Sequence, residues 1–146
     1  MEQNYRVRVA TSRDVETIFH FISHLEERSF DFKNFKDRYT ENLDNAAVLY
    51  LAAVNEEDAA IGFISCQGQN VLHHEGKAFE IQELYVARNY RGSGIGKTLL
   101  AALEENLADM GCEILEVTVN AKGTDAKRFY AKMGFQQTQL KFVKEL

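Results

Sequence analysis

The segment at residues 91–97, Arg-Gly-Ser-Gly-Ile-Gly-Lys, has the composition of an anion-binding turn. It follows a stretch typical of a β-strand and opens a stretch with helical spacing. The first amides of a helix have no partner inside the helix and lie at the positive end of its dipole. Because glycine lets the backbone approach a ligand closely, this turn is predicted to bind a phosphate group.

Two common phosphate-binding motifs do not fit this turn. A P-loop that binds ATP requires a glycine five residues before Gly96, and that position is Arg91. A dinucleotide-binding fingerprint requires a third glycine where Lys97 stands. It also requires an acidic ribose ligand at the end of the next strand, where the sequence has Asn120. The phosphate therefore belongs to another kind of ligand.

Few side chains suggest a metal site. His73, His74 and Glu75 can bind metals, but adjacent strand residues point to opposite faces, so two neighbouring histidines chelate one ion only in a turn. A divalent cation bridging a doubly charged ligand is chemically reasonable, yet the spacing favours surface or ligand-binding histidines, and no metal ligand is predicted. Cys66 and Cys112 match no metal-ligand spacing and are interpreted as reduced core thiols.

Hydrophobic spacing indicates the elements that must hold these residues. The glycine turn lies between a strand at 78–87 and a helix that begins at Ile95 and carries an apolar stripe to Met110. In chain order, the other predicted elements are a strand at 5–10, a helix after Thr11 with the apolar stripe Val15, Ile18, Phe19, Ile22 and Leu25, a helix from Asp31 to Leu43, a hairpin of 47–54 and 61–67, a strand at 113–119, a short helix after Thr124, and a strand at 135–143.

The order of these elements indicates the fold class. Strand–helix–strand units in the second half of the chain require parallel pairing. We therefore expect an α/β fold (an α+β mixed sheet), with a central mixed β-sheet and helices on both faces. Residues 1–146 are expected to form a single domain, because a chain of this length builds one core.

Composition argues against several functional classes. The net charge of −5 opposes a long nucleic-acid groove, since phosphate backbones are bound through clustered Lys and Arg. No stretch approaches the roughly 18 apolar residues of a membrane span, and the amino terminus lacks the apolar run of a signal peptide. We therefore expect a cytoplasmic protein with no nucleic-acid and no membrane partner.

The glycine turn also fits a known family signature. Arg91, Gly94 and Gly96 match the pattern Arg/Gln-x-x-Gly-x-Gly. In register with this turn, the other matching residues are Leu84-Tyr85-Val86, Asn120, Ala126, Tyr130 and Gly134-Phe135. Over nearly its whole length, the chain resembles the GNAT superfamily of N-acetyltransferases. The resemblance implies the GNAT-like acyl-CoA N-acyltransferase fold and the transfer of an acetyl group from acetyl-CoA to an amine.

By this resemblance, the backbone amides of the glycine turn bind the pyrophosphate of CoA. The pantetheine arm would lie between the strands that end near Val86 and Asn120, where splayed strands leave unpaired N–H and C=O groups that it can complete. Tyr130 would donate a proton to the leaving CoA thiolate, and a backbone N–H at 84–86 would bind the oxyanion. The cofactor-binding residues implied in this way are Leu84, Tyr85, Val86, Arg91, Gly92, Ser93, Gly94, Ile95, Gly96, Lys97, Asn120 and Tyr130.

Within the superfamily, several stretches resemble the bacterial aminoalkylphosphonate N-acetyltransferases. These stretches are Leu72-His73-His74, residues 80–84, Asp125-Ala126 and residues 128–130. The resemblance implies a small-molecule amine substrate with a phosphonate group, whose dianion needs cationic or N–H partners. Candidate acceptor-binding residues are Arg28, Arg38, His73, His74 and Glu83.

The amine must be deprotonated before it can attack the thioester, because an alkylammonium has a pKa near about 10. Strand alternation places Glu80 on the face of Gln82 and Leu84. Glu83 lies on the opposite face, which is otherwise apolar. Either carboxylate could be the base, and we favour Glu80. A β-bulge near Leu84 would exchange the two faces.

The acceptor remains open at this point. Polyamines, amino sugars and a protein lysine or N-terminus are alternatives, and so is a non-catalytic acetyl-CoA sensor, which would bind the cofactor without turnover. A slightly larger pocket would admit propionyl-CoA. A homodimer could form through the predicted last strand, where Leu140 and Phe142 lie at a sheet edge.

Overall fold

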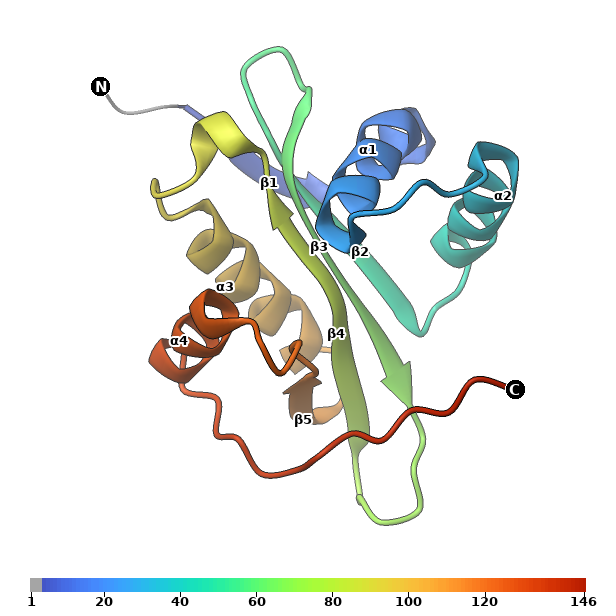
Figure 1. The fold of residues 1–146 in the computed structure, drawn as a ribbon, viewed down its shortest axis with the longest axis vertical. Coiled ribbons are helices and arrows are strands. Elements are labelled where there is room, and N and C mark those ends of the chain that lie inside the picture. Colours follow the sequence, from blue (N-terminus) through green and yellow to red (C-terminus); the bar gives the residue numbers. More distant parts are fainter. Residues whose placement is uncertain (1–3) are drawn as a thin grey trace.

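The computed structural model describes residues 4–146 (Figure 1). None of the helices in this range is long and apolar enough to cross a membrane. The principal elements, in chain order, are β1 (Arg6–Val9), α1 (Val15–Glu26), α2 (Phe32–Leu43), β2 (Val48–Val54), β3 (Ala60–Gln69), β4 (Lys77–Val86), α3 (Ile95–Ala108), β5 (Cys112–Val117) and α4 (Thr124–Lys132).

Within the described residues, the strands form a five-stranded sheet in the order β1-β2-β3-β4-β5. The first four strands pair antiparallel with their neighbours, whereas β5 pairs parallel to β4. A parallel pair cannot be joined by a tight turn, and here α3 makes the crossover. The prediction of a mixed sheet is confirmed.

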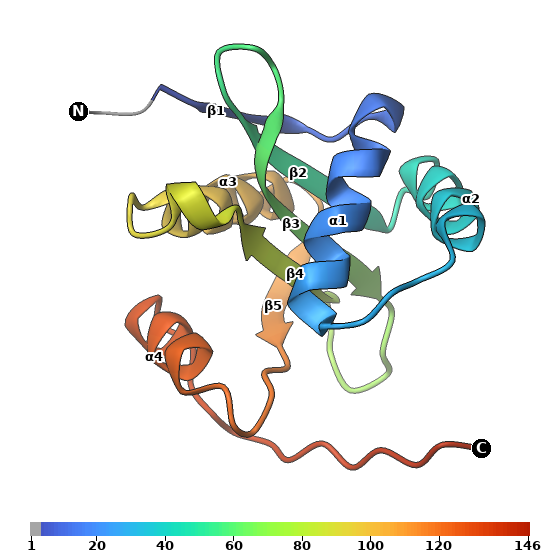
Figure 2. The ribbon, with the colours of Figure 1, turned by 45° about the horizontal axis from the view of Figure 1, so that its top comes forward.

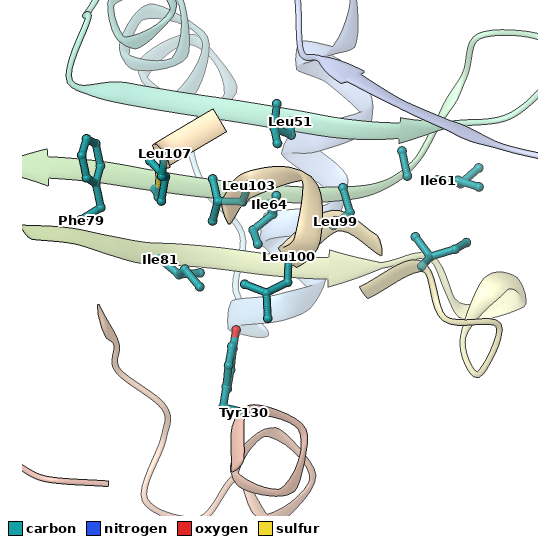
Figure 3. Packing of buried hydrophobic residues seen from close by; sticks show 13 residues of the cluster. Leu51, Ile61, Ile64, Phe79, Ile81, Leu99, Leu100, Leu103, Leu107 and Tyr130 are labelled. Carbon is teal, nitrogen blue, oxygen red and sulfur yellow. The ribbon is translucent and has the colours of Figure 1, made fainter. Parts of the chain in front are cut away.

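Helices cover both faces of the sheet, as predicted (Figures 1 and 2). On one face, Leu99 and Leu103 of α3 are fully buried against Ile64 and Phe79 of the sheet (Figure 3). On the other face, α1 and α2 bury a second cluster that includes Phe21, Tyr39 and Phe63. The sheet is therefore the shared wall of two apolar layers.

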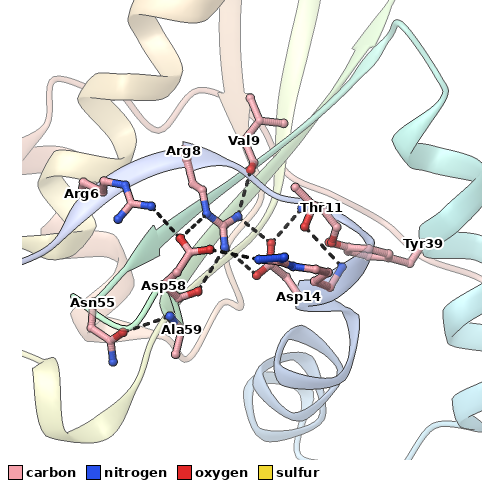
Figure 4. Close-up of polar contacts among 10 residues, drawn as sticks. Arg6, Arg8, Val9, Thr11, Asp14, Tyr39, Asn55, Asp58 and Ala59 are labelled. Atoms are coloured by element: carbon pink, nitrogen blue, oxygen red, sulfur yellow. Dashed lines mark hydrogen bonds and ion pairs between the residues drawn. The ribbon is translucent and has the colours of Figure 1, made fainter.

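An ion-pair cluster fixes the start of α1 (Figure 4). The Arg8 guanidinium of β1 donates to both carboxylate oxygens of Asp14, at 2.7 and 2.9 Å, and to Asp58 in the β2–β3 turn, at 2.9 Å. Asp14 also accepts a hydrogen bond from the Thr11 amide in a capping box. Bidentate pairs of this kind fix geometry as well as charge. The cluster therefore joins β1, the β2–β3 hairpin and the first turn before α1.

A β-bulge lies in the middle of β4. Ile81 pairs with Cys66 and Glu83 pairs with Ser65, so the intervening Gln82 has no partner on β3. The bulge considered near Leu84 from the sequence is thus present at Gln82. It shifts the alternation by one residue, and the α3 face of the strand is formed by Phe79, Ile81, Leu84 and Val86.

The predicted strand at 135–143 is wrong. These residues form neither helix nor strand, and Leu140, Phe142 and Val143 are 78%, 90% and 78% exposed. Their alternation suits a strand, but a strand needs a paired neighbour, and the segment runs away from the edge of β5 (Figure 2). Leu25, predicted to be buried, is 38% exposed because it lies beyond Ile22, the last buried residue of α1.

The Arg8–Asp14 pair generates a stability prediction. Burial would raise the pKa of the Asp14 carboxyl, but the hydrogen bonds from Arg8 and Thr11 and the charge of Arg8 outweigh burial and lower it. Asp14→Asn should lower the free energy of unfolding at pH 7 by about 2 kcal/mol. Loss of one partner of a buried pair costs about 3–5 kcal/mol, and here Arg8 keeps Asp58. Urea unfolding measures this difference.

The contribution of Asp14 to the free energy of unfolding should depend on pH in a defined direction. A carboxyl whose pKa is lowered by folding stabilises the protein above its unfolded pKa of about 3.9, and this contribution is lost as the pH falls through the folded-state pKa. The gap between wild type and Asp14→Asn should therefore close in acid. Asp37→Asn, which breaks the exposed Lys33–Asp37 pair, is the control and should hardly change the unfolding midpoint. Equal losses in both variants would contradict the assigned role of Asp14.

Candidate active site

The glycine turn adopts the backbone shape that its sequence predicts. Gly92 and Gly94 have positive φ values of 82° and 86°, which other residues rarely adopt. A Cβ at either position would meet nothing within 4 Å, so the backbone conformation, not crowding, requires glycine. Gly94 caps α3 without a side-chain hydrogen bond, and the first intrahelical bond runs from the Thr98 amide to the Gly94 carbonyl. The amides before Thr98 can therefore bind an anion.

Arg91 attaches this turn to the end of β4. Its Nε donates to the Val86 carbonyl at 2.9 Å, and its guanidinium lies 5.2 Å from the centre of the Tyr85 ring. The Ser93 hydroxyl donates to the Tyr90 carbonyl and holds the other side of the turn. The arginine of the family signature thus positions the turn in this structure.

The strands β4 and β5 separate beside this turn. Their pairing ends at Ile81 and Val117, and residues 83–86 of β4 pair with β3 alone. We call this divergence the strand fork: residues 82–86 of β4 and 118–120 after β5. Glu80 lies at its base, where its carboxylate accepts hydrogen bonds from Thr118 Oγ1 and Gln82 Nε2, each at 3.1 Å. The fork leaves β4 backbone groups available to an extended ligand.

Tyr130 lies on the side of the sheet that α3 covers. It projects from α4 toward the core between β4 and α3 (Figure 3), and it is 9% exposed. The rings of Phe129 and Phe135 contact it edge-on, with centroids 5.1 and 5.3 Å away. Burial raises the pKa of the Tyr130 hydroxyl to about 12. The hydroxyl therefore stays protonated at neutral pH and can donate a proton.

A cleft of about 680 Å³ opens on the opposite face of the sheet, between α1, α2 and strands β2 to β4. Arg28 and Arg38 line its helical side, and Glu83 lines its strand side. Within residues 4–146, neither arginine has a carboxylate partner, and the Arg28 guanidinium lies 4.6 Å from the centre of the Phe30 ring. The cleft is therefore lined by two arginines and three carboxylates, those of Glu26 and Asp31 on the helical side and Glu83 on the strand side.

The β4 bulge turns Glu83 into this cleft. Its carboxylate accepts a hydrogen bond from the hydroxyl of the buried Ser65, and its own amide donates to the Ser65 oxygen at 3.0 Å. Burial raises the pKa of the Glu83 carboxyl, the hydrogen bond from Ser65 opposes the rise, and the charge of Glu26 adds to it. Ser65 was not predicted as a site residue. The signal available was one polar residue inside the apolar run 61–66.

Several residues predicted for the site lie outside the cleft. Glu80 is at the strand fork and does not line the cleft. His73 is exposed, and the ring of His74 lies 3.5 Å from Glu113 and 3.9 Å from Glu116, outside the cleft. Across the part of the chain that the structure describes, no three metal-binding side chains come together. Asn120 is exposed just after β5.

Comparison with known proteins agrees with this geometry. Residues 14–135 match the family model described as Acetyltransferase (GNAT) family. An aminoalkylphosphonate N-acetyltransferase of Salmonella typhimurium is 36% identical over 140 residues, which cover 96% of this chain and 90% of that protein. A peptidyl-lysine N-acetyltransferase of Escherichia coli is 32% identical over 94 residues, covering 64% of this chain and 54% of its own length.

Solved structures share the fold at low sequence identity. A transcriptional regulator from Bacillus halodurans superimposes with a TM-score of 0.89 at 19% identity, covering 98% of this chain and 100% of that one. An aminoglycoside N-acetyltransferase in complex with CoA superimposes with a TM-score of 0.87 at 16% identity, covering 100% and 97%. The sequence matches confirm the predicted resemblance to the GNAT superfamily, and these structures share its fold. The chain belongs to the acetyltransferase (GNAT) family and is an N-acetyltransferase that uses acetyl-CoA.

Proposed function

We propose that this enzyme acetylates the primary amine of a short aminoalkylphosphonate, such as aminomethyl- or aminoethylphosphonate. The observation that carries the proposal is the pair of arginines, Arg28 and Arg38, on the helical side of a cleft that also holds Glu83 on its strand side. The helical side carries the carboxylates of Glu26 and Asp31 as well. A zwitterion with an ammonium group and a phosphonate dianion matches this arrangement. The 36% identity to an aminoalkylphosphonate N-acetyltransferase supports the same substrate class.

In this proposal, acetyl-CoA lies along the strand fork. The amides of 91–97 bind its pyrophosphate at the start of α3. The pantetheine arm pairs with the free edge of β4 at 82–86, as an added strand would. The thioester then lies where β4 and β5 separate, and a β4 amide at 84–86 binds the oxyanion that forms during attack.

The three candidate proton-transfer groups take different roles. Glu83, oriented by Ser65, binds the substrate ammonium in the cleft. Glu80, held by two hydrogen bonds at the fork, accepts the proton as the amine attacks the thioester carbon. Tyr130 gives its proton to the departing CoA thiolate. Attack forms the C–N bond and the oxyanion, and collapse of this intermediate breaks the C–S bond. The nitrogen proton goes to Glu80, the Tyr130 proton goes to the CoA thiolate, and the products are the amide and the CoA thiol.

The substrate assignment is tested by following thiol release from acetyl-CoA with a panel of amines. The panel contains aminomethyl- and aminoethylphosphonate, a polyamine, glucosamine and a lysine peptide, each with and without Mg²⁺ and with EDTA. We expect the highest kcat/KM for an aminoalkylphosphonate. Preferred turnover of the lysine peptide would indicate that the enzyme acetylates proteins and not aminoalkylphosphonates. CoA binding without turnover of any amine would indicate a non-catalytic acetyl-CoA sensor.

The variant Arg38→Gln tests whether the cleft binds the phosphonate group, and propylamine is the matched control substrate. It should raise KM for aminoethylphosphonate about tenfold or more, because one cation opposite the dianion is lost. KM for propylamine, which lacks the phosphonate, should stay the same. An equal change for both amines would place Arg38 outside the phosphonate site.

The CoA site is tested by Gly94→Asp. This change places a carboxylate beside the pyrophosphate and should weaken CoA binding, measured by calorimetry, at least about tenfold. Gly111→Asp is the matched control, because Gly111 also has a positive φ of 74° with open space around it but lies at the far end of α3. If both variants bind CoA normally, the pyrophosphate does not lie at this turn.

The variants Glu80→Gln and Glu83→Gln distinguish the roles of the two carboxylates. The first should lower kcat about 100-fold with a nearly unchanged acceptor KM, because only the base is lost. The second should mainly raise the acceptor KM. Since burial raises the pKa of Glu83 above its ordinary value, the wild-type acceptor KM should also rise as the pH falls through that pKa. The opposite pattern of kcat and KM would exchange the two roles.

A further inference from the structure

The cleft wall contains a tyrosine hydroxyl that takes no part in the proton transfers described above. Tyr50 of β2 lines the cleft. Its ring stacks on the ring of Tyr39 in α2, with centroids 5.4 Å apart, and meets the ring of Phe63 in β3 edge-on, also at 5.4 Å. Because aromatic neighbours on two elements fix the ring plane, the hydroxyl at its tip has a defined position.

The Tyr50 hydroxyl accepts a hydrogen bond and keeps its own proton for another partner. Asn42 of α2 donates from Nδ2 to Tyr50 Oη at 2.8 Å. Among residues 4–146, the Tyr50 hydroxyl donates no hydrogen bond in return. A tyrosine hydroxyl can donate one bond while it accepts another. The contact with Asn42 therefore orients the hydroxyl and leaves its O–H available to a ligand.

Strand pairing places Tyr50 on the same face of the sheet as Glu83. Tyr50 pairs with Ser65 on β3, and Ser65 pairs with Glu83 on β4. Paired residues of antiparallel neighbours have their side chains on one face. The three polar residues thus form a row across the sheet, with about 4.8 Å between neighbouring strands. The row has a carboxylate at one end and the Tyr50 hydroxyl at the other.

Arg38 and Glu83 both act on the Tyr50 hydroxyl. Burial raises the pKa of Tyr50, the hydrogen bond from Asn42 opposes the rise, the charge of Glu83 adds to it, and the charge of Arg38 lowers it. The hydroxyl therefore stays protonated at neutral pH. Arg38 and Asn42 are four residues apart on α2, so they lie on one side of the helix, and both line the cleft. The O–H of Tyr50 is thus available near a guanidinium.

The charges of the cleft favour an uncharged donor at this place. The carboxylates of Glu26, Asp31 and Glu83 line the cleft together with two arginines. A phosphonate dianion that enters the cleft therefore meets more negative than positive groups. A hydroxyl donates a strong hydrogen bond to an anionic oxygen and needs no carboxylate partner of its own. Such a donor strengthens anion binding without attracting the carboxylates away from the arginines.

We propose that Tyr50 is a specificity-determining residue of the acceptor site. Its hydroxyl donates a hydrogen bond to the phosphonate beside Arg38, and Asn42 is the positioning residue that orients it. This inference rests on the proposed function, because it assigns a further partner to the same substrate. The amine end of the substrate lies at Glu83 and the anionic end at Tyr50, along one row of paired residues. Amines without a phosphonate group gain nothing from the hydroxyl.

Calorimetric titration of the CoA-saturated enzyme with methylphosphonate, which has the anion and no amine, tests this role directly. Tyr50→Phe removes the hydroxyl and keeps the ring. It should raise the Kd about tenfold, because a hydrogen bond to a charged group is lost. Tyr39→Phe is the matched control. The Tyr39 hydroxyl already donates to the Thr11 carbonyl at 2.7 Å, so its removal should leave the Kd for methylphosphonate unchanged. Circular dichroism verifies that each variant is folded.

Kinetics distinguish anion recognition from a general effect on the cleft. Tyr50→Phe should raise KM for aminoethylphosphonate about tenfold, with kcat and KM for propylamine close to the wild-type values. Asn42→Leu should also weaken methylphosphonate binding, but it should add nothing in the Tyr50→Phe background, because Asn42 acts through Tyr50. Additive losses would overturn the positioning role of Asn42.

The role of Tyr50 and the substrate class fail in different ways. If wild type and Tyr50→Phe bind methylphosphonate equally, or if Tyr39→Phe loses as much affinity as Tyr50→Phe, the Tyr50 hydroxyl does not contact the anion. The aminoalkylphosphonate substrate then stands on the result for Arg38→Gln. If wild type does not bind methylphosphonate at all, the proposed function fails, and the role of Tyr50 fails with it.

Discussion

The unpaired Gln82 in β4 is the constraint on which the rest of the site depends. Without it, strict alternation would place Glu83 on the side of Ile81, against α3. The extra residue shifts the alternation, so Leu84 and Val86 continue the apolar α3 face while Glu83 turns toward the cleft. The same shift places Tyr85 in the cluster under α1 and α2. A single inserted residue thus turns Leu84 and Val86 toward the α3 core and Glu83 toward the cleft.

The bulge also lies at the point where β4 and β5 stop pairing. Below it, the parallel ladder from Lys77 to Ile81 fixes the distance between the strands. Above it, β4 keeps β3 as a partner and leaves its other edge free. Glu80, Gln82 and Thr118 connect the two strands at this point through hydrogen bonds. The strand fork and the cleft are therefore adjacent, the fork at the free edge of β4 and the cleft on the face of the sheet under α1 and α2.

Both sides depend on elements that are fixed far from the chemistry. The glycine turn is held by Arg91, which contacts the end of β4 through the Val86 carbonyl and the Tyr85 ring. The cleft depends on α1 and α2, and the Arg8 cluster positions the chain that enters α1. Tyr39 adds a bond across this layer, because its hydroxyl donates to the Thr11 carbonyl. The charged side chains of the cleft thus rest on buried and bidentate contacts.

Local sequence determined much of this protein. Periodicity located the helices and the strands through Val117, and the spacing of Arg91, Gly94 and Gly96 predicted an anion-binding turn and indicated the family, because these features depend on near neighbours in the chain. The segment at 135–143 shows where local information ends: its alternation is strand-like, but a strand exists only when another edge pairs with it.

The site was decided by tertiary structure. Alternation alone could not place Glu80 and Glu83, because one bulged residue in the middle of a strand reverses every side chain after it. Ser65 was invisible as a partner of Glu83, since the two residues meet only through the pairing of β3 with β4. Sequence fixes residue types and local turns, whereas long-range register decides which side chains share a cleft. That register is set by packing over the whole sheet and is not a property of any short segment.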